Sequence, residues 1–201
     1  MTIYNMPQGS DEWHQLRLGK FSASKAYQLF MAPSTKGYSD LINQIVYERI
    51  TGKGTDDFVS PDMMRGIEME PEAREAYQLR TFNLVKEVGF VELTEFVGCS
   101  PDGLIGKDGL LEIKCLKWNT HIQLLFDGKY DKRYDYQMQF QMYVTDRSWC
   151  DFFCYHPELS PFLKRVNRND KVIDEIKINL NVAIGEVVKR IKKISPLSAI
   201  Y

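Results

Sequence analysis

The fold is decided by Ser100-Pro101-Asp102-Gly103 and, after a short turn, Leu111-Glu112-Ile113-Lys114. Gly106-Lys107-Asp108-Gly109 separates the two stretches and is a strong hairpin turn signal. Folding back at this turn brings Asp102 close to Glu112, with the register uncertain by one or two residues. Two carboxylates and a lysine then converge, which predicts a divalent-cation site with the lysine free to polarise a water or a phosphate oxygen.

Alternation of side chains along the second half of this hairpin supports that interpretation. Glu112 and Lys114 share one face of an extended strand, and the apolar Leu111, Ile113 and Cys115 share the other. We therefore expect the apolar side chains in a core and the charged pair at its edge. The alternative is an ordinary exposed hairpin, because a lone Glu-x-Lys pattern occurs by chance in most proteins. The acid on the turn and the alternation together favour the cation site.

Length and composition predict one globular domain over residues 1–201, with 44% hydrophobic and 26% charged residues. No apolar run approaches the length of a membrane span, and residues 1–5 show no signal-peptide pattern. The four cysteines contain no C-x-x-C pair, which argues against a zinc or iron–sulfur site and predicts reduced, packed thiols in a cytosolic protein. They are Cys99, Cys115, Cys150 and Cys154.

The formal net charge of −1 argues mildly against a nucleic-acid partner, since neutralising phosphates requires lysine and arginine. Basic residues nevertheless cluster within 129–133, 164–171 and 189–193, and acidic residues within 68–75. This distribution is compatible with one positive face or with separately solvated helix surfaces.

Periodicity and capping residues predict a mainly helical first half, followed by strands and further helices. The expected early helices run over 10–19, over 22–31 or 24–31, from a Ser39 cap to Gly52, and from Ser60-Pro61 to about residue 80 with a break. The expected strands are 84–93, 96–99, 104–105, 110–115, 149–155 and 162–166, and the later helices are 120–126, 134–145 and 170–194. The fold class is α/β, a central mixed β-sheet flanked by helices, with the acidic hairpin central.

Two further segments carry residues of the types that bind cations or phosphates. Glu70 lies on the fourth expected helix, where a carboxylate near the hairpin acids completes a two-cation site; the alternative is an exposed acidic helix turn. Arg17 precedes the serines at the start of the next helix, Ser24 among them. A guanidinium, hydroxyl groups and free helix amides all bind anions, which favours a binding site for a terminal phosphate. The alternative is a surface arginine beside an N-cap serine.

Gln137 and Gln141 share one face of the helix expected over 134–145, beside a stripe of methionine and phenylalanine. These glutamines are expected either to orient a water or contact phosphate, or to be solvated while the stripe enters the core. His14, His121 and His156 form no metal or catalytic pattern, and we expect structural roles for them.

Five motifs follow one another along the chain: Trp13-x-x-x-Arg17-x-Gly19-x-x-x-Ala23-Ser24, Gly66-x-x-x-Glu70-Pro71-x-Ala73-Arg74, Ser100-Pro101-Asp102-Gly103, Glu112-Ile113-Lys114 and Gln137-x-Gln139-x-x-Met142-Tyr143-Val144-Thr145. In this order they resemble the lambda-exonuclease (YqaJ-like viral recombinase) family of the PD-(D/E)XK nuclease superfamily. The resemblance extends from residue 13 to about residue 145. It implies a restriction-endonuclease-like core.

The resemblance also implies a magnesium-dependent exodeoxyribonuclease that digests one strand of linear double-stranded DNA from 5′ to 3′, for recombination by single-strand annealing. Two Mg²⁺ ions are implied, and Mn²⁺ is an alternative because it accepts the same oxygen ligands. The implied partners are double-stranded DNA ends, two further copies in a homotrimer, and a phage single-strand annealing protein, with no membrane. The implied setting is the cytoplasm of a bacterial host cell, from a phage or prophage gene.

Position by position, the resemblance assigns roles to residues of this sequence. Asp102 and Glu112 are implied metal ligands together with the Ile113 carbonyl, and Glu70 is an implied ligand of the second cation. Lys114 is implied to position or activate the attacking water, with Gln137 as an active-site support. Arg17, Ser24 and Ser100 are implied to form the pocket for the 5′-phosphate.

Three rival functions start from the same residues. A structure- or sequence-selective endonuclease on the same core would cut a covalently closed circle, which an end-requiring exonuclease leaves intact. An iron–sulfur nuclease of the Cas4 type is disfavoured by too few cysteines at the ends of the chain. A catalytically silent DNA-end-binding protein is compatible with the net charge near zero. It is disfavoured because a silent module has no need for acids that repel one another without metal.

Overall fold

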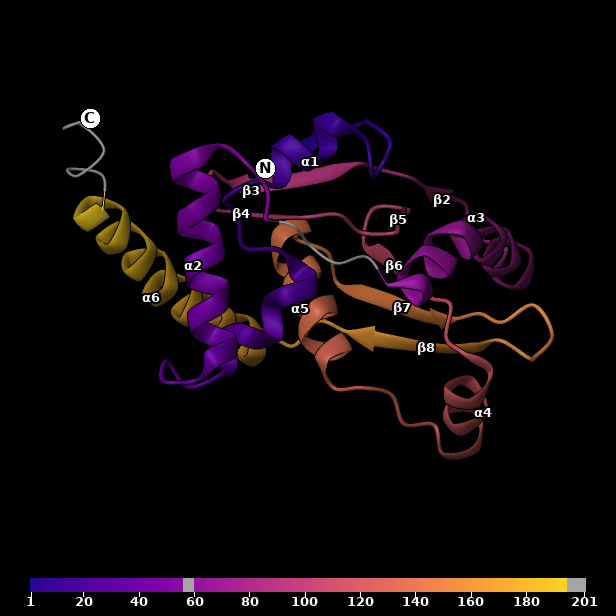
Figure 1. Cartoon of the computed structure of the whole chain (residues 1–201). Helices are drawn as coiled ribbons and strands as arrows, with labels where there is room; N and C mark the ends of the chain where they lie inside the picture. The colour runs from indigo at the N-terminus through magenta and orange to yellow at the C-terminus, as the bar shows by residue number, and fades with distance from the viewer. Residues whose placement is uncertain (56–59, 195–201) are drawn as a thin grey trace.

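Residues 1–55 and 60–194 are described by a computed structural model, and in these ranges the chain forms two β-sheets flanked by helices (Figure 1). The larger sheet has the strand order β2-β5-β6-β7-β8 and the smaller has the order β1-β3-β4. The strands are β1 (Thr2–Tyr4), β2 (Val85–Lys86), β3 (Phe90–Thr94), β4 (Val97–Cys99), β5 (Gly103–Ile105), β6 (Gly109–Lys114), β7 (Trp149–Cys154) and β8 (Phe162–Asn167). The helices are α1 (Asp11–Arg17), the 3-10 helix η1 (Ala23–Phe30), α2 (Lys36–Thr51), α3 (Pro61–Thr81), α4 (Trp118–Asp127), α5 (Arg133–Thr145) and α6 (Asp170–Ile194).

Strand β6 occupies the centre of the larger sheet and carries the acidic half of the hairpin. It pairs antiparallel with β5, and this register sets Gly103 opposite Leu111. It pairs in parallel with β7, and Glu112 is aligned with Phe152. The mixed α/β sheet with a central hairpin is therefore the fold expected from the sequence.

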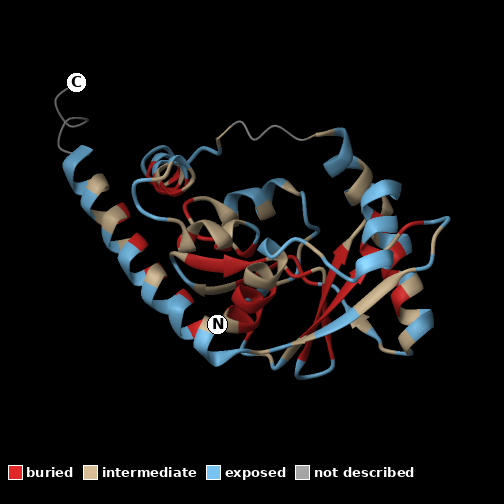
Figure 2. Ribbon diagram, turned by 90° about the horizontal axis from the view of Figure 1, so that it is seen from below, coloured by how far each residue is buried: buried red, intermediate tan, exposed pale blue. Residues whose placement is uncertain are grey.

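Both faces of β6 are covered, and its residues belong to the buried strands drawn red in Figure 2. On one face Leu111 and Ile113 pack with Tyr77 of α3. On the other face α5 covers the sheet, and Glu112 has no exposed surface at all. The expectation that the Glu/Lys pair lies at the edge of a core was wrong for Glu112, because α5 packs over its side of the strand.

The sequence placed the helix starts at Ser10 and at Ser60-Pro61 correctly and the cap of the third helix wrongly. Ser10 accepts a hydrogen bond from the Trp13 amide, and Ser60 accepts one from the Met63 amide. Helix α2 begins at Lys36 with Thr35 as its cap, and not at Ser39, whose amide already donates within the first turn. Helix α3 continues through Pro71 without the expected break, and residues 23–30 form a 3-10 helix where a regular helix was expected.

The single strand expected over 84–93 is two strands in different sheets. The chain turns between β2 and β3, where the Gly89 amide donates to the Tyr4 carbonyl at 3.0 Å. A Cβ atom at Gly89 would lie 2.3 Å from the Met6 carbonyl oxygen, so the close approach of the N-terminal segment requires glycine there. That segment contains β1, a three-residue strand that the sequence reading missed.

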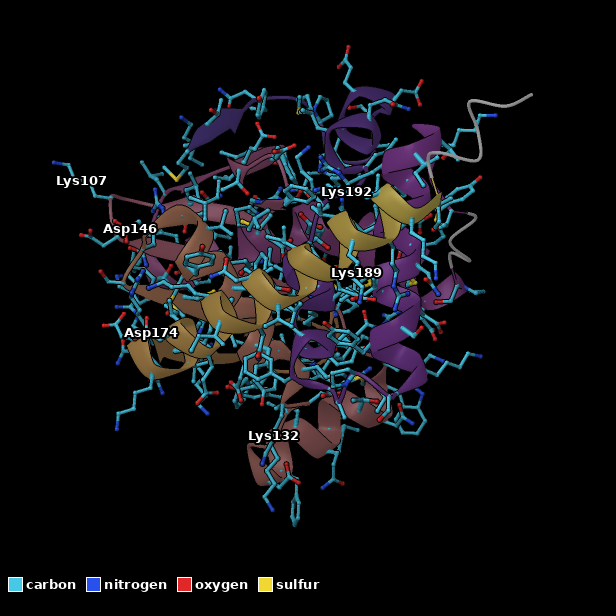
Figure 3. All side chains as sticks on the ribbon, turned by 90° about the vertical axis from the view of Figure 1, so that its left-hand side faces the viewer. Lys107, Lys132, Asp146, Asp174, Lys189 and Lys192 are labelled. Carbon is cyan, nitrogen blue, oxygen red and sulfur yellow. The ribbon has the colours of Figure 1, made fainter. Side chains whose placement is uncertain are left out.

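The basic clusters of the sequence lie on different elements: 129–133 just before and at the start of α5, 164–171 on β8 and the start of α6, and 189–193 at the end of α6. Figure 3 shows Lys189 and Lys192 on α6 and Lys132 below them in the same view. The four cysteines are unpaired, and three of them are buried. No helix within residues 1–55 or 60–194 is long and apolar enough to cross a membrane.

Candidate active site

The centre of the site is the carboxylate of Glu112, which is completely buried. Its Oε1 atom accepts hydrogen bonds from Lys114 Nζ and from Gln137 Nε2, the latter at 2.6 Å. Its Oε2 atom accepts one from Gln141 Nε2 at 2.7 Å. Gln137 and Gln141 are one helical turn apart, so α5 presents two amide donors side by side. The buried charge is thereby held by one cation and two neutral donors.

Lys114 is bonded to Glu112 and is not the free side chain expected from the sequence. Burial alone would lower the pKa of Lys114, but the charges of Glu112 and Asp102 outweigh burial and raise that pKa above its usual value. These two charges therefore favour the ammonium form of Lys114. A lysine that keeps its charge is suited to stabilising negative charge on a phosphate and unsuited to abstracting a proton.

Asp102 lies immediately before β5 and is tied to β6. Its Oδ2 atom accepts a hydrogen bond from the Ile113 amide at 2.6 Å. Burial raises the pKa of Asp102 well above its usual value, and the charge of Glu112 raises it further. The hairpin thus brings the two acids into electrostatic contact, as its turn signal predicted.

Glu70 on α3 is held by Arg74, whose Nη2 atom lies 2.5 Å from Glu70 Oε1. Arg74 also contacts Glu87 at 2.9 Å and donates from Nε to the Asp102 carbonyl at 3.3 Å. Burial raises the pKa of Glu70, Arg74 opposes this rise, and Glu112 adds to it. Glu70 therefore lies within electrostatic reach of the hairpin acids, while Arg74 joins α3 to the turn that carries Asp102.

A cavity of about 460 Å³ opens between the N-terminal loop and α3. Glu70, Arg74 and Asp102 line one side of it, and residues 5–8 line another. This hollow gives access to the site from the side of Glu70 and Asp102.

Two of the three residues expected to bind the 5′-phosphate, Arg17 and Ser100, are connected through Trp13, whereas Ser24 forms no hydrogen bond with it. The Arg17 guanidinium lies over the Trp13 ring, 3.9 Å from its centroid. The indole nitrogen of Trp13 donates to Ser100 Oγ at 2.8 Å and to the Gly89 carbonyl at 3.0 Å. Ser24 is exposed on η1, and its hydroxyl lies 3.5 Å from that of Ser22. The structure therefore joins Arg17 to Ser100 through one aromatic side chain.

The donor atoms suit a hard divalent cation, because carboxylate and carbonyl oxygens are the ligands of Mg²⁺ and Mn²⁺. Asp102 and Glu112 oppose one another electrostatically, and a bound cation relieves that opposition. Across residues 1–55 and 60–194, no three His, Cys, Asp or Glu side chains are arranged to hold a metal ion. The Glu112 carboxylate accepts hydrogen bonds from the side-chain amides of Gln137 and Gln141 and from Lys114. Glu70 forms an ion pair with Arg74. Asp102 and Glu112 thus fit a cation by charge and donor type, whereas the roles of Glu70 and of the Ile113 carbonyl stay predictions.

The sequence assigned no role to two residues around the site, Arg74 and Trp13, and left the role of Gln141 open. Arg74 is four residues after Glu70, a spacing typical of helical ion pairs, and this signal was available. Trp13 is four residues before Arg17 on α1, which is also a helical-neighbour spacing. Gln141 was placed on the same helical face as Gln137, but its contact with Glu112 depends on how α5 packs on the sheet.

Residues 12–148 match the profile of the family described as the YqaJ-like viral recombinase domain. The chain belongs to this family. The matched segment contains all the site residues described above, from Trp13 to Gln141. No curated protein matches the chain in sequence.

The chain is similar to solved structures of exonucleases. The alkaline exonuclease LHK-Exo from Laribacter hongkongensis is similar with 35% identity and a TM-score of 0.87, over 94% of this chain and 98% of that one. Its complex with dAMP matches with 34% identity and the same TM-score and coverage. A phage-related exonuclease from Haemophilus somnus 129PT has 16% identity and a TM-score of 0.68, over 87% of this chain and 96% of that one, which shows the shared fold.

Proposed function

We propose that this YqaJ-like protein is a magnesium-dependent exonuclease that digests one strand of linear double-stranded DNA from 5′ to 3′. The observation that carries the proposal is the buried Glu112 carboxylate, held by Lys114 and two amides beside Asp102. Further support comes from the similarity to LHK-Exo, an alkaline exonuclease, over nearly the whole chain. The proposed product is single-stranded DNA for recombination by annealing.

In this proposal Asp102 and Glu112 hold Mg²⁺, with the Ile113 carbonyl as a third ligand and Glu70 serving a second ion. The bound ions supply charge that neutralises the phosphate and lowers the pKa of a water. Water attacks phosphorus in line with the departing 3′-oxygen, and the remaining strand keeps a new 5′-phosphate. The Lys114 ammonium stabilises negative charge as it develops, and Gln137 keeps Glu112 oriented.

The new 5′-phosphate is proposed to bind Arg17, Ser24 and Ser100, which moves the strand forward by one nucleotide. Support comes from Trp13, which positions both the Arg17 guanidinium and the Ser100 hydroxyl. The test compares linear duplexes with 5′-phosphate and 5′-hydroxyl ends. Equal rates and equal processivity on both ends would remove this pocket from the proposal.

The central test is digestion of an end-labelled linear duplex beside a covalently closed circle, with and without Mg²⁺. Release of label from the 5′ end only, with the circle intact and no reaction without Mg²⁺, supports the proposal. Cutting of the circle would instead identify an endonuclease on the same core. Binding of ends without any hydrolysis would identify a silent end-binding protein.

We further propose that three copies assemble around DNA and deliver single strands to a phage annealing protein, in the cytoplasm of the bacterial host. Support for a subunit contact comes from exposed apolar side chains at the end of α3 and the start of β2, namely Leu79, Phe82 and Leu84. Light scattering of the wild type and of Phe82→Glu tests this arrangement. A monomeric wild type at micromolar concentration would contradict it.

A further inference from the structure

Gln141 contacts the site but has no role in the function proposed above. Its side chain is completely buried on α5. Among the described residues, this side chain forms a hydrogen bond only with Glu112, from Nε2 to Oε2 at 2.7 Å. An amide in this position acts on the site through Glu112 alone.

The three donors around Glu112 divide unequally between its two oxygens. Oε1 accepts from both Lys114 and Gln137, whereas Oε2 accepts only from Gln141. Each carboxylate oxygen has two lone pairs, so Oε1 is filled and Oε2 keeps one acceptor position. The terminal torsion of a glutamate is soft, and only a donor on Oε2 as well as on Oε1 fixes the plane of the carboxylate.

The other end of the Gln141 amide is unsatisfied. Gln141 Oε1 is buried and accepts no hydrogen bond from the described part of the chain. A buried carbonyl without a partner costs about 1–3 kcal/mol. Gln139, two residues earlier, is also buried but uses both ends, since Nε2 donates to the Asn167 carbonyl and Oε1 accepts from the Asn169 amide, each at 2.9 Å. Gln139 therefore stabilises the fold, whereas an apolar side chain would serve the fold better at position 141.

We propose that Gln141 is a positioning residue that fixes the Glu112 carboxylate so that Oε2 keeps one acceptor position open for a divalent cation. This inference rests on the proposed function, because it concerns the same cation. Donors behind a metal ligand commonly change metal affinity by 10- to 100-fold when removed. Gln141 would set affinity for the ion without touching the ion or the DNA.

The test measures binding of Ca²⁺ and Mn²⁺ by calorimetry, which does not require catalysis. Gln141→Met keeps the length of the side chain and removes the donor, and we expect its dissociation constant to rise about 10-fold or more. The matched control is Gln139→Met, which should lower the melting temperature and leave the dissociation constant unchanged. With Mg²⁺, Gln141→Met should lower kcat at saturating metal with little change in the KM for DNA.

Each outcome decides the inference. A Gln141→Met protein that binds the ions as the wild type does, while the wild type both binds and cleaves, overturns the positioning role alone. A wild type that binds no divalent ion and does not cleave overturns the proposed function and this role with it. Where Gln141→Met does not fold, Gln141→Asn replaces it, because its amide is one methylene too short to reach Glu112 and the same loss of affinity is expected.

Discussion

Two buried acids lie on neighbouring strands of the larger sheet and face opposite sides of it. Glu112 on β6 is covered by α5, and Asp151 on β7 is covered by α3. Asp151 accepts two hydrogen bonds from Arg165, at 2.8 and 2.9 Å, and one from Tyr77 at 2.7 Å. Glu112 accepts from one lysine and two amides. Burial is the same, but the partners differ.

The difference teaches which buried charge is available for chemistry. A bidentate guanidinium neutralises Asp151, and Arg165 in turn stacks on Trp149 with its Cζ 3.6 Å from the ring centroid. That arrangement is complete without any ligand. Glu112 instead stands beside Asp102, whose pKa its charge helps to raise. The repulsion between Asp102 and Glu112 favours binding of a cation. The hydrogen-bond partners of a buried acid therefore indicate a functional site better than its burial does.

Removing Lys114 should produce the largest effect on the Glu112 side. Lys114→Ala should reduce the rate of DNA cleavage about 10³-fold, because a fixed positive group is lost where charge develops on the phosphate. DNA binding, measured by fluorescence anisotropy, should persist. Lys107→Ala is the control, since Lys107 lies in the exposed turn of the same hairpin and should leave cleavage unchanged. Cleavage retained by Lys114→Ala would remove the lysine from the mechanism.

Removing Asp151 should act on stability and leave catalysis alone. Asp151→Ala removes the acceptor of the buried Tyr77 hydroxyl and the partner of the half-exposed Arg165, so the free energy of unfolding in urea should fall by about 3 kcal/mol. Cleavage per folded molecule should stay within about twofold. Asp174→Ala is the control, because its ion pair with Lys177 on α6 is exposed and should contribute less than about 1 kcal/mol. A loss of catalysis with intact stability in Asp151→Ala would erase the contrast between the two acids.

Adding Ca²⁺ should distinguish the same two acids by a smaller, ligand-linked effect. At 100 times its dissociation constant, an ion that binds only the folded state stabilises it by about 2.7 kcal/mol. The melting temperature of the wild type should therefore rise with Ca²⁺, and that of Asp151→Asn should rise equally. Glu112→Gln should lose the increase. The measurement is thermal unfolding by circular dichroism at several Ca²⁺ concentrations.

The smallest expected effect concerns Tyr77 and alkaline pH. Burial and the hydrogen bond to Asp151 raise the pKa of Tyr77 from 10.0 to about 12. The folded state then keeps a proton that the unfolded state loses, so this contribution is full below pH 10 and is lost as pH rises through about 12. Tyr77→Phe should lower stability at pH 8 by about 1 kcal/mol and show a shallower decline between pH 10 and 12. Equal slopes for both proteins would contradict the assignment.

The sequence predicted what depends on neighbours along the chain. Asp102 and Glu112 are joined by a turn with a strong local signal, and their approach followed from it. The helix starts at Ser10 and at Ser60-Pro61 were predicted for the same reason, since helix capping involves only the next few residues.

The sequence did not predict features that depend on packing between distant segments. The burial of Glu112 and the contact from Gln141 arise from the placement of α5 on the sheet. The separation of β2 from β3 arises from the N-terminal segment, whose Tyr4 carbonyl accepts from Gly89. The role of Trp13 depends on Ser100, 87 residues away. Each of these features depends on a contact between residues far apart in the sequence, which a local sequence pattern does not predict.

The parallel pairing of β6 with β7 has a consequence for the order in which the site forms. The hairpin leaves the ribosome first, α5 with its two amides follows, and β7 comes last of the three. A chain still under synthesis therefore holds the acids before it holds the groups that orient them. No fragment that stops short of residue 154 contains the whole sheet that holds the site, so the site is complete only late in synthesis.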